Sequence, residues 1–146
     1  MVRTHPMKFC LALTALLFLS VSALATTFEK VVLIGCYDGD TCKFTLPGIH
    51  PFFGKKISVR IRGIDTPEIR GKCAAEKRKA KSARDYIRRL LKAASRIDLV
   101  DVKRGKYFRI IATVRADGVD VVPLMIEKGL GRPYQGGRRQ GWCGRP

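Results

Sequence analysis

Two short segments concentrate acidic side chains in a chain that is otherwise strongly basic. The sequence has 146 residues, with 29 Lys and Arg but only 12 Asp and Glu. Residues 37–41 read YDGDT, and residues 59–68 read VRIRGIDTPE. The acids of these two segments are Asp38, Asp40, Asp65 and Glu68. Carboxylates in close quarters repel one another unless a cation lies among them, so their convergence would indicate a cation site.

The types of donor atom indicate which cation such a site would hold. Carboxylates offer only oxygen ligands, which favours a hard ion such as Ca²⁺ or Mg²⁺ over zinc or copper. Two plainer interpretations stay open. Asp-Gly-Asp is a common hairpin turn, and Asp65 followed three residues later by Glu68 also fits a helix capping box. Among so many basic residues, Arg60 and Arg109 are equally compatible with solvated surface charges.

Short strands separated by turns must position these groups. Residues 28–35 and 41–46 are expected to form a hairpin whose turn centres on Gly39, which places Cys36 opposite Cys42. Residues 56–64 alternate as a third strand, with Arg60 on the face that points away from the core. Residues 47–56 are expected to be a Pro/Gly loop. Two further strands are predicted in residues 96–108 and 109–114.

Two segments have a helical period. Between Ala74 and Ala94, apolar residues recur at helical spacing opposite a basic face, which predicts an amphipathic helix lying on a sheet. Residues 119–130 predict a shorter helix that ends at Gly129. Residues 131–146 hold too much Gly, Pro and Arg for regular structure. The sequence therefore predicts a mostly β, α+β protein: a five-stranded Greek-key barrel of the OB type with two to three helices.

The first 25 residues resemble an export signal, with basic residues, an apolar run and an Ala-Leu-Ala cleavage pattern. A retained membrane anchor is the alternative, but the apolar run is shorter than the roughly 20 residues that a span needs. Residues 26–146 are then expected to form one exported domain, periplasmic or extracellular, without a membrane span. Its last part, residues 135–146, is expected to be an extended tail that Trp142 and Cys143 hold on the body.

Charge and cysteine content agree with export and with a polyanionic partner. Loss of Arg3 and Lys8 with the signal would lower the net charge only from +17 to +15. Nucleic acid, anionic lipid or acidic polysaccharide would each satisfy this charge. Four cysteines remain after residue 25, which suggests two disulfides rather than a zinc site, because no C-x-x-C spacing occurs. The favoured pairs are Cys36 with Cys42, from the hairpin, and Cys73 with Cys143, which would anchor the tail.

Four segments, taken in order, resemble the staphylococcal nuclease-like (thermonuclease) family. They are YDGDT at 37–41, VRIRGIDTPE at 59–68, GKYFR at 105–109 and IEKGL at 126–130. The first two together are quite specific, whereas the last two would be weak by themselves. The resemblance covers nearly all of the chain after residue 25 and implies a Ca²⁺-dependent nuclease acting on DNA or RNA.

The resemblance also implies a role for individual residues. The metal ligands would be Asp40, Asp65 and the carbonyl of Thr66. The catalytic groups would be Glu68, as the general base that activates water, with Arg60 and Arg109 on the scissile phosphate. The residues near the terminal phosphate of the nucleotide would be Lys106 and Tyr107. One position departs from the family, which usually has glycine where Phe108 stands, and this side chain is large enough to shift Arg109 or narrow the groove.

Two other functions compete with a secreted, monomeric endonuclease. A secreted OB module that binds nucleic acid without cutting it would explain the charge and the fold. It would not explain why one chain combines the set Asp40, Arg60, Asp65 and Glu68. A cationic protein acting on membranes or acidic polysaccharide is supported by the basic helix, but the apolar face of that helix is rich in alanine and lacks the bulky anchors of interfacial helices.

Overall fold

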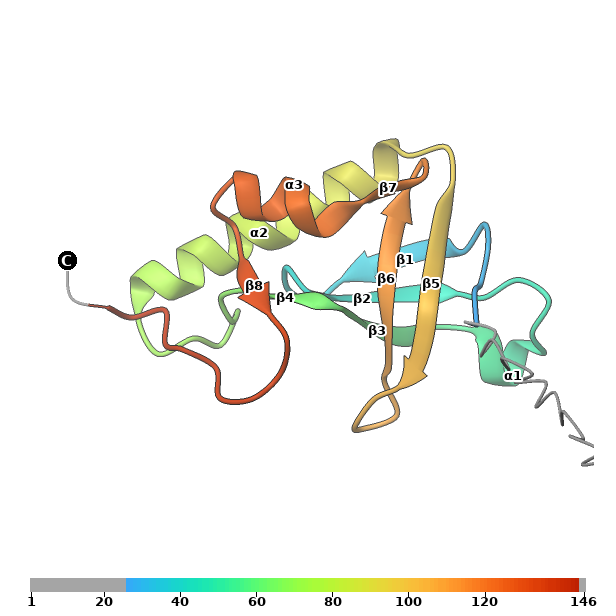
Figure 1. Ribbon diagram of the computed structural model, residues 1–146, viewed down its shortest axis with the longest axis horizontal. Coiled ribbons are helices and arrows are strands. Elements are labelled where there is room, and N and C mark those ends of the chain that lie inside the picture. The colour runs from blue at the N-terminus through green and yellow to red at the C-terminus, as the bar shows by residue number, and fades with distance from the viewer. Residues whose placement is uncertain (1–25, 145–146) are drawn as a thin grey trace, which may run out of the picture.

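The computed structural model describes residues 26–144, so the predicted signal peptide lies outside the described residues. The main sheet has the strand order β1 (Val32–Cys36), β2 (Thr41–Thr45), β3 (Ile57–Ile61), β6 (Ile110–Ala116) and β5 (Ile97–Arg104), with β7 (Val119–Asp120) paired to β6. A second sheet pairs β4 (Gly63–Asp65) with β8 (Arg132–Tyr134). The helices are α1 (Pro51–Gly54), α2 (Ala74–Ala93) and α3 (Val121–Glu127) (Figure 1).

The main sheet curls until its two ends meet. Strands β3 and β6 pair in parallel, whereas the other neighbours pair antiparallel. At the open side, Phe28 and Leu99 exchange two backbone hydrogen bonds of 2.8 Å, and the Val31 amide donates to the Ile97 carbonyl at 2.9 Å. These bonds join the segment before β1 to β5, the far end of the sheet. A mostly β, α+β fold of the OB type is confirmed.

Helix α2 covers the curled sheet with its apolar stripe. Ala80, Ala83, Ile87 and Leu91 are buried along this stripe, as the helical spacing predicted. In Figure 1, α2 and α3 lie together along one side of the sheet. The core they share with the strands includes Phe44, Val59, Ile61, Leu99, Val114 and Met125. Burial of this apolar surface is the main force that fixes the barrel on the helix.

The expected third strand is wrong in its extent. Residues 56–64 do not run straight: β3 ends at Ile61, and β4 begins at Gly63. The backbone φ of Gly63 is +87°, a conformation that only glycine adopts without strain. The chain therefore turns between the strands, and β4 leaves the main sheet to pair with β8.

Three other boundary predictions also need correction. The expected loop at 47–56 contains α1, because His50 accepts the Phe52 amide at the start of the helix and Pro51 suits its first turn. The shorter helix begins at Val121 instead of 119, because the Asp120 side chain accepts the Val122 amide and caps it. The C-terminal stretch that was expected to lack regular structure contains β8.

Both disulfides of the structure join the pairs that the sequence analysis favoured. Cys36 is bonded to Cys42, and these residues are direct partners across β1 and β2. Cys73 is bonded to Cys143, which ties the C-terminal tail to the start of α2 across 70 positions of sequence. The first bond braces a hairpin locally, whereas the second closes a long loop and constrains the unfolded chain more strongly.

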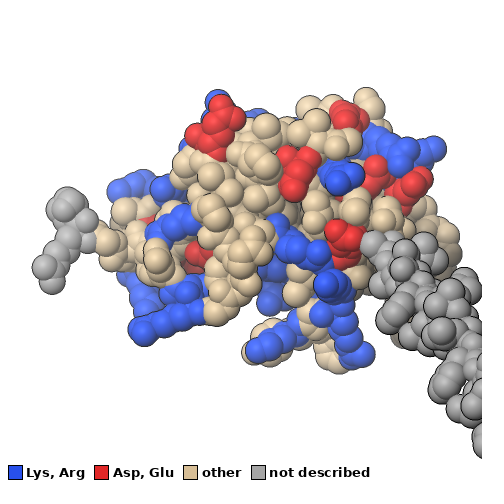
Figure 2. Space-filling view, in the orientation of Figure 1, with Lys and Arg blue, Asp and Glu red and all other residues tan. Residues whose placement is uncertain are grey.

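Basic side chains gather along the lower edge of the face shown in Figure 2, over the β5–β6 turn and the C-terminal tail.

Within residues 26–144, no helix is long and apolar enough to cross a lipid bilayer.

Candidate active site

The turn between β1 and β2 is pressed against the rest of the molecule. A Cβ atom at Gly39 would lie 2.8 Å from side-chain carbons of both Ala83 and Thr66, so any larger residue would force them apart. The Asp40 carbonyl accepts the Ile61 amide at 2.8 Å, and the Asp40 amide donates to Asp38 Oδ1 at 3.2 Å. Glycine at this position thus allows the acidic turn to sit directly beside the segment that follows β4.

Asp40 connects this turn to the second acidic segment. Its side chain is buried, and its Oδ2 accepts the backbone amide of Thr66 at 3.1 Å and the Thr66 hydroxyl at 3.0 Å. Its Oδ1 forms an ion pair with the Arg60 guanidinium. The Asp40 carboxylate therefore binds Thr66, which lies 26 positions later in the sequence. Strand β3 supplies Arg60, the arginine next to this carboxylate.

Asp65 stands at the end of β4, opposite Arg132 of β8. Its buried carboxylate accepts the Trp142 indole N–H on Oδ2 at 3.2 Å. Its Oδ1 lies 2.6 Å from Arg139 Nε, but the contact lacks the alignment of a hydrogen bond. Within residues 26–144, Asp65 Oδ1 is the buried side-chain nitrogen or oxygen atom that has no hydrogen-bond partner. Such an oxygen is suited to a cation, which needs no donor hydrogen.

Glu76 was missed by sequence reasoning, although it shapes the loop that carries Glu68. The buried carboxylate of Glu76 accepts the Glu68 amide at 3.3 Å and the Lys72 amide at 2.9 Å. A Cβ atom at Gly71 would collide with the Glu76 side chain, so a larger residue there would displace the Glu76 carboxylate. Without Glu76, the backbone amides of Glu68 and Lys72 would lose their acceptor.

The alternative interpretation of Asp65 and Glu68 as a capping box is wrong. The N-cap of α2 is Cys73, whose sulfur accepts the Glu76 amide at 3.4 Å. Glu76 stands three residues after this cap, which is the glutamate position of a capping box. That spacing is the sequence signal that could have identified Glu76.

Arg139 was also missed, and it lies where the acidic segments meet. Its guanidinium forms ion pairs with Asp65, with Asp40 Oδ2 at 3.4 Å and with Glu68. Burial works against the charge of Arg139, but the hydrogen bond to Glu68 and the charges of the two aspartates outweigh it, so its pKa is raised. Three carboxylates from two segments therefore surround one cationic group that comes from the C-terminal tail.

The predicted phosphate-binding arginines line one cavity. Arg60 and Arg109 border a space of about 370 Å³ together with Asp40, Glu68 and Arg139. Besides its ion pair with Asp40, Arg60 donates to the Ile64 carbonyl at 3.1 Å. The structure thus brings Arg60, Arg109 and the acids to the same place.

The residues expected near the terminal phosphate lie on the β5–β6 turn and do not line this cavity. Lys106 is exposed, and the Tyr107 side chain is 84% exposed. Phe108 is 96% exposed, so its ring neither fills the cavity nor narrows it. Tyr107 and Phe108 both have φ of 57°, the left-handed region that L residues rarely adopt. The turn therefore presents two neighbouring aromatic rings to solvent.

Asp38 contributes less negative charge than the other acids near neutral pH. Burial, aided by the charge of Asp40, raises the pKa of Asp38 to about 7. A carboxyl that is partly protonated adds little to the repulsion in the turn. Of the two acids in this turn, only Asp40 contacts the Arg139 guanidinium.

The chemistry of the donors fits a hard divalent cation. Asp40, Asp65 and Glu68 supply carboxylate oxygens at the meeting point of the two segments, and Asp65 Oδ1 lacks a hydrogen bond. In the described part of the chain, the group of His, Cys, Asp or Glu whose ligand atoms all lie within 4.8 Å of one another is Cys73, Glu76 and Cys143, whereas the three carboxylates around Arg139 are spaced more widely. Those sulfurs form a disulfide and are not thiolates, so that cluster does not suit a metal.

A family model described as staphylococcal nuclease homologue matches residues 58–141, which is more than half of the chain. The matched residues include Arg60, Asp65, Glu68 and Arg109, and they extend into the tail to residue 141, so that Arg139 is also included. The match begins after the β1–β2 turn, so Asp40 lies outside it. No curated protein matches the chain.

Proposed function

The chain belongs to the staphylococcal nuclease homologue family, and on that premise we propose that it is a Ca²⁺-dependent nuclease. It would hydrolyse phosphodiester bonds of DNA or RNA with little sequence specificity. The observation that supports this best is the convergence of Asp40, Asp65 and Glu68 beside the cavity that Arg60 and Arg109 border. A module that only binds nucleic acid needs the positive charge but has no use for these three converging acids, two of which are buried.

Each group has a role that its chemistry suits. Asp40, Asp65 and the Thr66 carbonyl would hold the ion, which supplies positive charge to polarise phosphate oxygen and water when it is bound. Glu68 is 41% exposed at its side chain, so a water molecule can reach it and give up a proton. Arg60 and Arg109 would bind the scissile phosphate, because guanidinium groups match phosphate oxygens in pairs. Charge that develops on these oxygens would strengthen the contacts in the transition state.

The remaining features fit one exported domain that works as a monomer on a polyanion. Residues 26–146 would be the domain, after removal of residues 1–25 and with residues 135–146 as its tail. The net charge of this domain, +15 after loss of Arg3 and Lys8 from the total of +17, favours nucleic acid as the partner. The two disulfides suit a periplasmic or extracellular location, where thiols are oxidised. Ca²⁺ is favoured over Mg²⁺ because extracellular modules tolerate weak calcium sites.

The exposed rings of the β5–β6 turn predict a contribution to binding of single strands. Replacing Tyr107 and Phe108 together by alanine is expected to weaken binding of single-stranded DNA by about tenfold, because base stacking contributes roughly 1–3 kcal/mol per base. Lys106, which is exposed on the same turn, would contact the phosphate backbone of the nucleic acid. Fluorescence anisotropy with a labelled oligonucleotide in chelator measures this affinity without cleavage.

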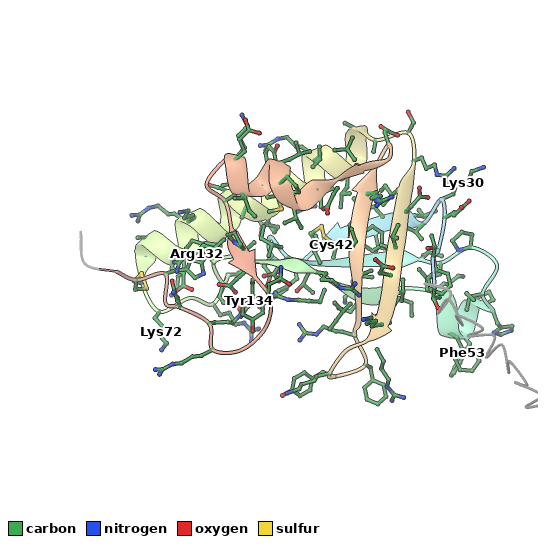
Figure 3. The ribbon with its side chains drawn as sticks, in the orientation of Figure 1. Lys30, Cys42, Phe53, Lys72, Arg132 and Tyr134 are labelled. Carbon is green, nitrogen blue, oxygen red and sulfur yellow. A yellow bond between two sulfur atoms is a disulfide. The ribbon has the colours of Figure 1, made fainter. Side chains whose placement is uncertain are left out.

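Helix α1 offers a matched control for the aromatic pair. Phe52 and Phe53 are also adjacent and exposed, by 82% and 67%, with Lys55 and Lys56 close behind. Figure 3 shows Phe53 on α1, well away from Tyr134 and Arg132 of β8. Alanine at both positions of α1 should leave the affinity unchanged. Equal losses in the two double variants would show that the turn has no special role.

The nuclease is distinguished from a binding module by products. Purified protein with intact disulfides is incubated with single-stranded DNA, duplex DNA and RNA in millimolar Ca²⁺, and the products are resolved on denaturing gels. The proposal predicts shorter fragments from at least one substrate. Stable binding of all three substrates without fragments would favour the binding module instead.

A further inference from the structure

The C-terminal strap, residues 135–143, is held on the body at several points. Arg132 donates to the Gln140 side chain at 3.2 Å and to the Gly141 carbonyl at 2.9 Å. The Arg132 guanidinium also lies over the Trp142 ring, 3.6 Å from its centroid. Cys143 then closes the strap through its disulfide to Cys73. Figure 3 shows Arg132 on β8, between the strap and α2.

These attachments place one side chain of the strap among the acids. Arg139 contacts Asp65 Oδ1, Asp40 Oδ2 and Glu68 Oε1. Its neighbour Arg138 is exposed and has no ion pair within the described residues. The strap therefore places the guanidinium of one particular residue, Arg139, beside the acids. A general excess of positive charge would not select this residue over its neighbour.

The same oxygens are those that a divalent cation would need. Asp65 Oδ1 and Asp40 Oδ2 can face the guanidinium or an ion at coordination distance, but not both at once. The reason is that the two positive groups would repel each other at such short range. Tethering at Cys143 keeps Arg139 at a high effective concentration near the acids. Removal of Arg139 would leave three carboxylates with less opposing charge, and they would then attract a metal ion more strongly.

We propose that Arg139 is a positioning residue that holds the three carboxylates together and competes with the divalent cation for them, with the disulfide-held strap setting the cation affinity. The proposal rests on the proposed function, because the same acids are taken as the cation site. The competition is reciprocal. If the strap lowers the affinity of the site for the cation, a bound cation weakens the attachment of the strap by the same free energy. The strap thus tunes the calcium concentration at which the site fills.

Calcium titration by calorimetry, without nucleic acid, tests the competition directly. Arg139→Gln is expected to lower the Kd for Ca²⁺ by about tenfold, because the charge-assisted contacts that compete for the same oxygens are lost. Arg138→Gln is the matched control, because it removes the same charge from the neighbouring position, and its Kd should stay within about twofold of the parent protein. Arg139→Lys keeps the charge and should remain closer to the parent than Arg139→Gln does.

The disulfide is tested by a double-mutant cycle. Cys143→Ser is expected to lower the Kd for Ca²⁺ in the parent protein, because the strap is then less well tethered. The same change should have little further effect when Arg139→Gln is already present, since the two residues act through one contact. Thermal melting with chelator shows whether each variant is folded before titration.

Each result bears on the proposal in a defined way. An unchanged or higher Kd in Arg139→Gln, with a folded protein, would overturn the competition while leaving the nuclease assignment in place if cleavage persists. Independent, additive effects of Cys143→Ser and Arg139→Gln would overturn the role of the strap. If neither the parent nor Arg139→Gln binds Ca²⁺, the competition fails together with the calcium assignment itself.

Discussion

Glutamine in place of Glu68 is expected to lower the turnover number by about two orders of magnitude or more, as loss of a general base commonly does. The amide has nearly the same shape but cannot take a proton from water. The Glu68 side chain is 41% exposed, and its backbone stays bound to Glu76 through the amide, so the fold should survive. Turnover is measured with saturating DNA and Ca²⁺, alongside thermal melting.

A control for this change is an acid away from the site. Glu127 is exposed at the end of α3, and Glu127→Gln removes one negative charge without touching the acids. Its turnover should equal that of the parent. A Glu68→Gln protein that cuts at nearly the parent rate would exclude Glu68 as the base, and the proton would then have to pass to another group.

Alanine in place of Arg60 is also expected to reduce turnover by about two orders of magnitude or more, because removal of a group that stabilises transition-state charge has an effect of this size. Arg60 borders the cavity with Arg109, and it also pairs with the buried Asp40. Arg60→Ala would therefore remove the proposed phosphate contact, and it leaves Asp40 with fewer partners. Arg60→Lys restores the charge but not the two-pronged geometry, so it should recover only part of the activity.

Arg62 provides the comparison, since it follows Arg60 by two residues. Its guanidinium contacts the carbonyl and the carboxylate of Asp101 instead of the three acids of the site. Arg62→Ala should change turnover by only a few-fold, whereas the KM for nucleic acid can rise because one positive charge is lost. If Arg60→Ala and Arg62→Ala reduce turnover equally, Arg60 is merely one of many surface charges.

The parts of the fold that were predictable depend on local patterns. The Cys36–Cys42 pairing follows from a short turn centred on Gly39, because the register of a hairpin is set within a few residues. Helix α2 was predicted almost to its ends, since its apolar residues recur with one period over 20 residues. Asp40 and Asp65 were singled out because acids are scarce in a basic chain.

The parts that escaped prediction depend on contacts between distant residues. Strand β8 forms because it pairs with β4, and nothing in residues 132–134 alone predicts a strand that contains proline. Arg139 reaches Glu68 across 71 positions and Asp40 across 99. Among 29 basic residues, one arginine in a Gly-rich tail carries no local sign of such a contact. From the sequence, the predicted disulfide at Cys143 was the main restraint on where this tail can lie.

Metal dependence of cleavage tests the central claim, that the converging acids hold a cation that drives hydrolysis. The rate of DNA cleavage is measured in millimolar Ca²⁺, after addition of a calcium chelator, and after excess Ca²⁺ is restored. The account predicts cleavage, then loss of cleavage, then recovery to the original rate. Cleavage that continues unchanged in chelator, by protein free of contaminating nuclease, would contradict it.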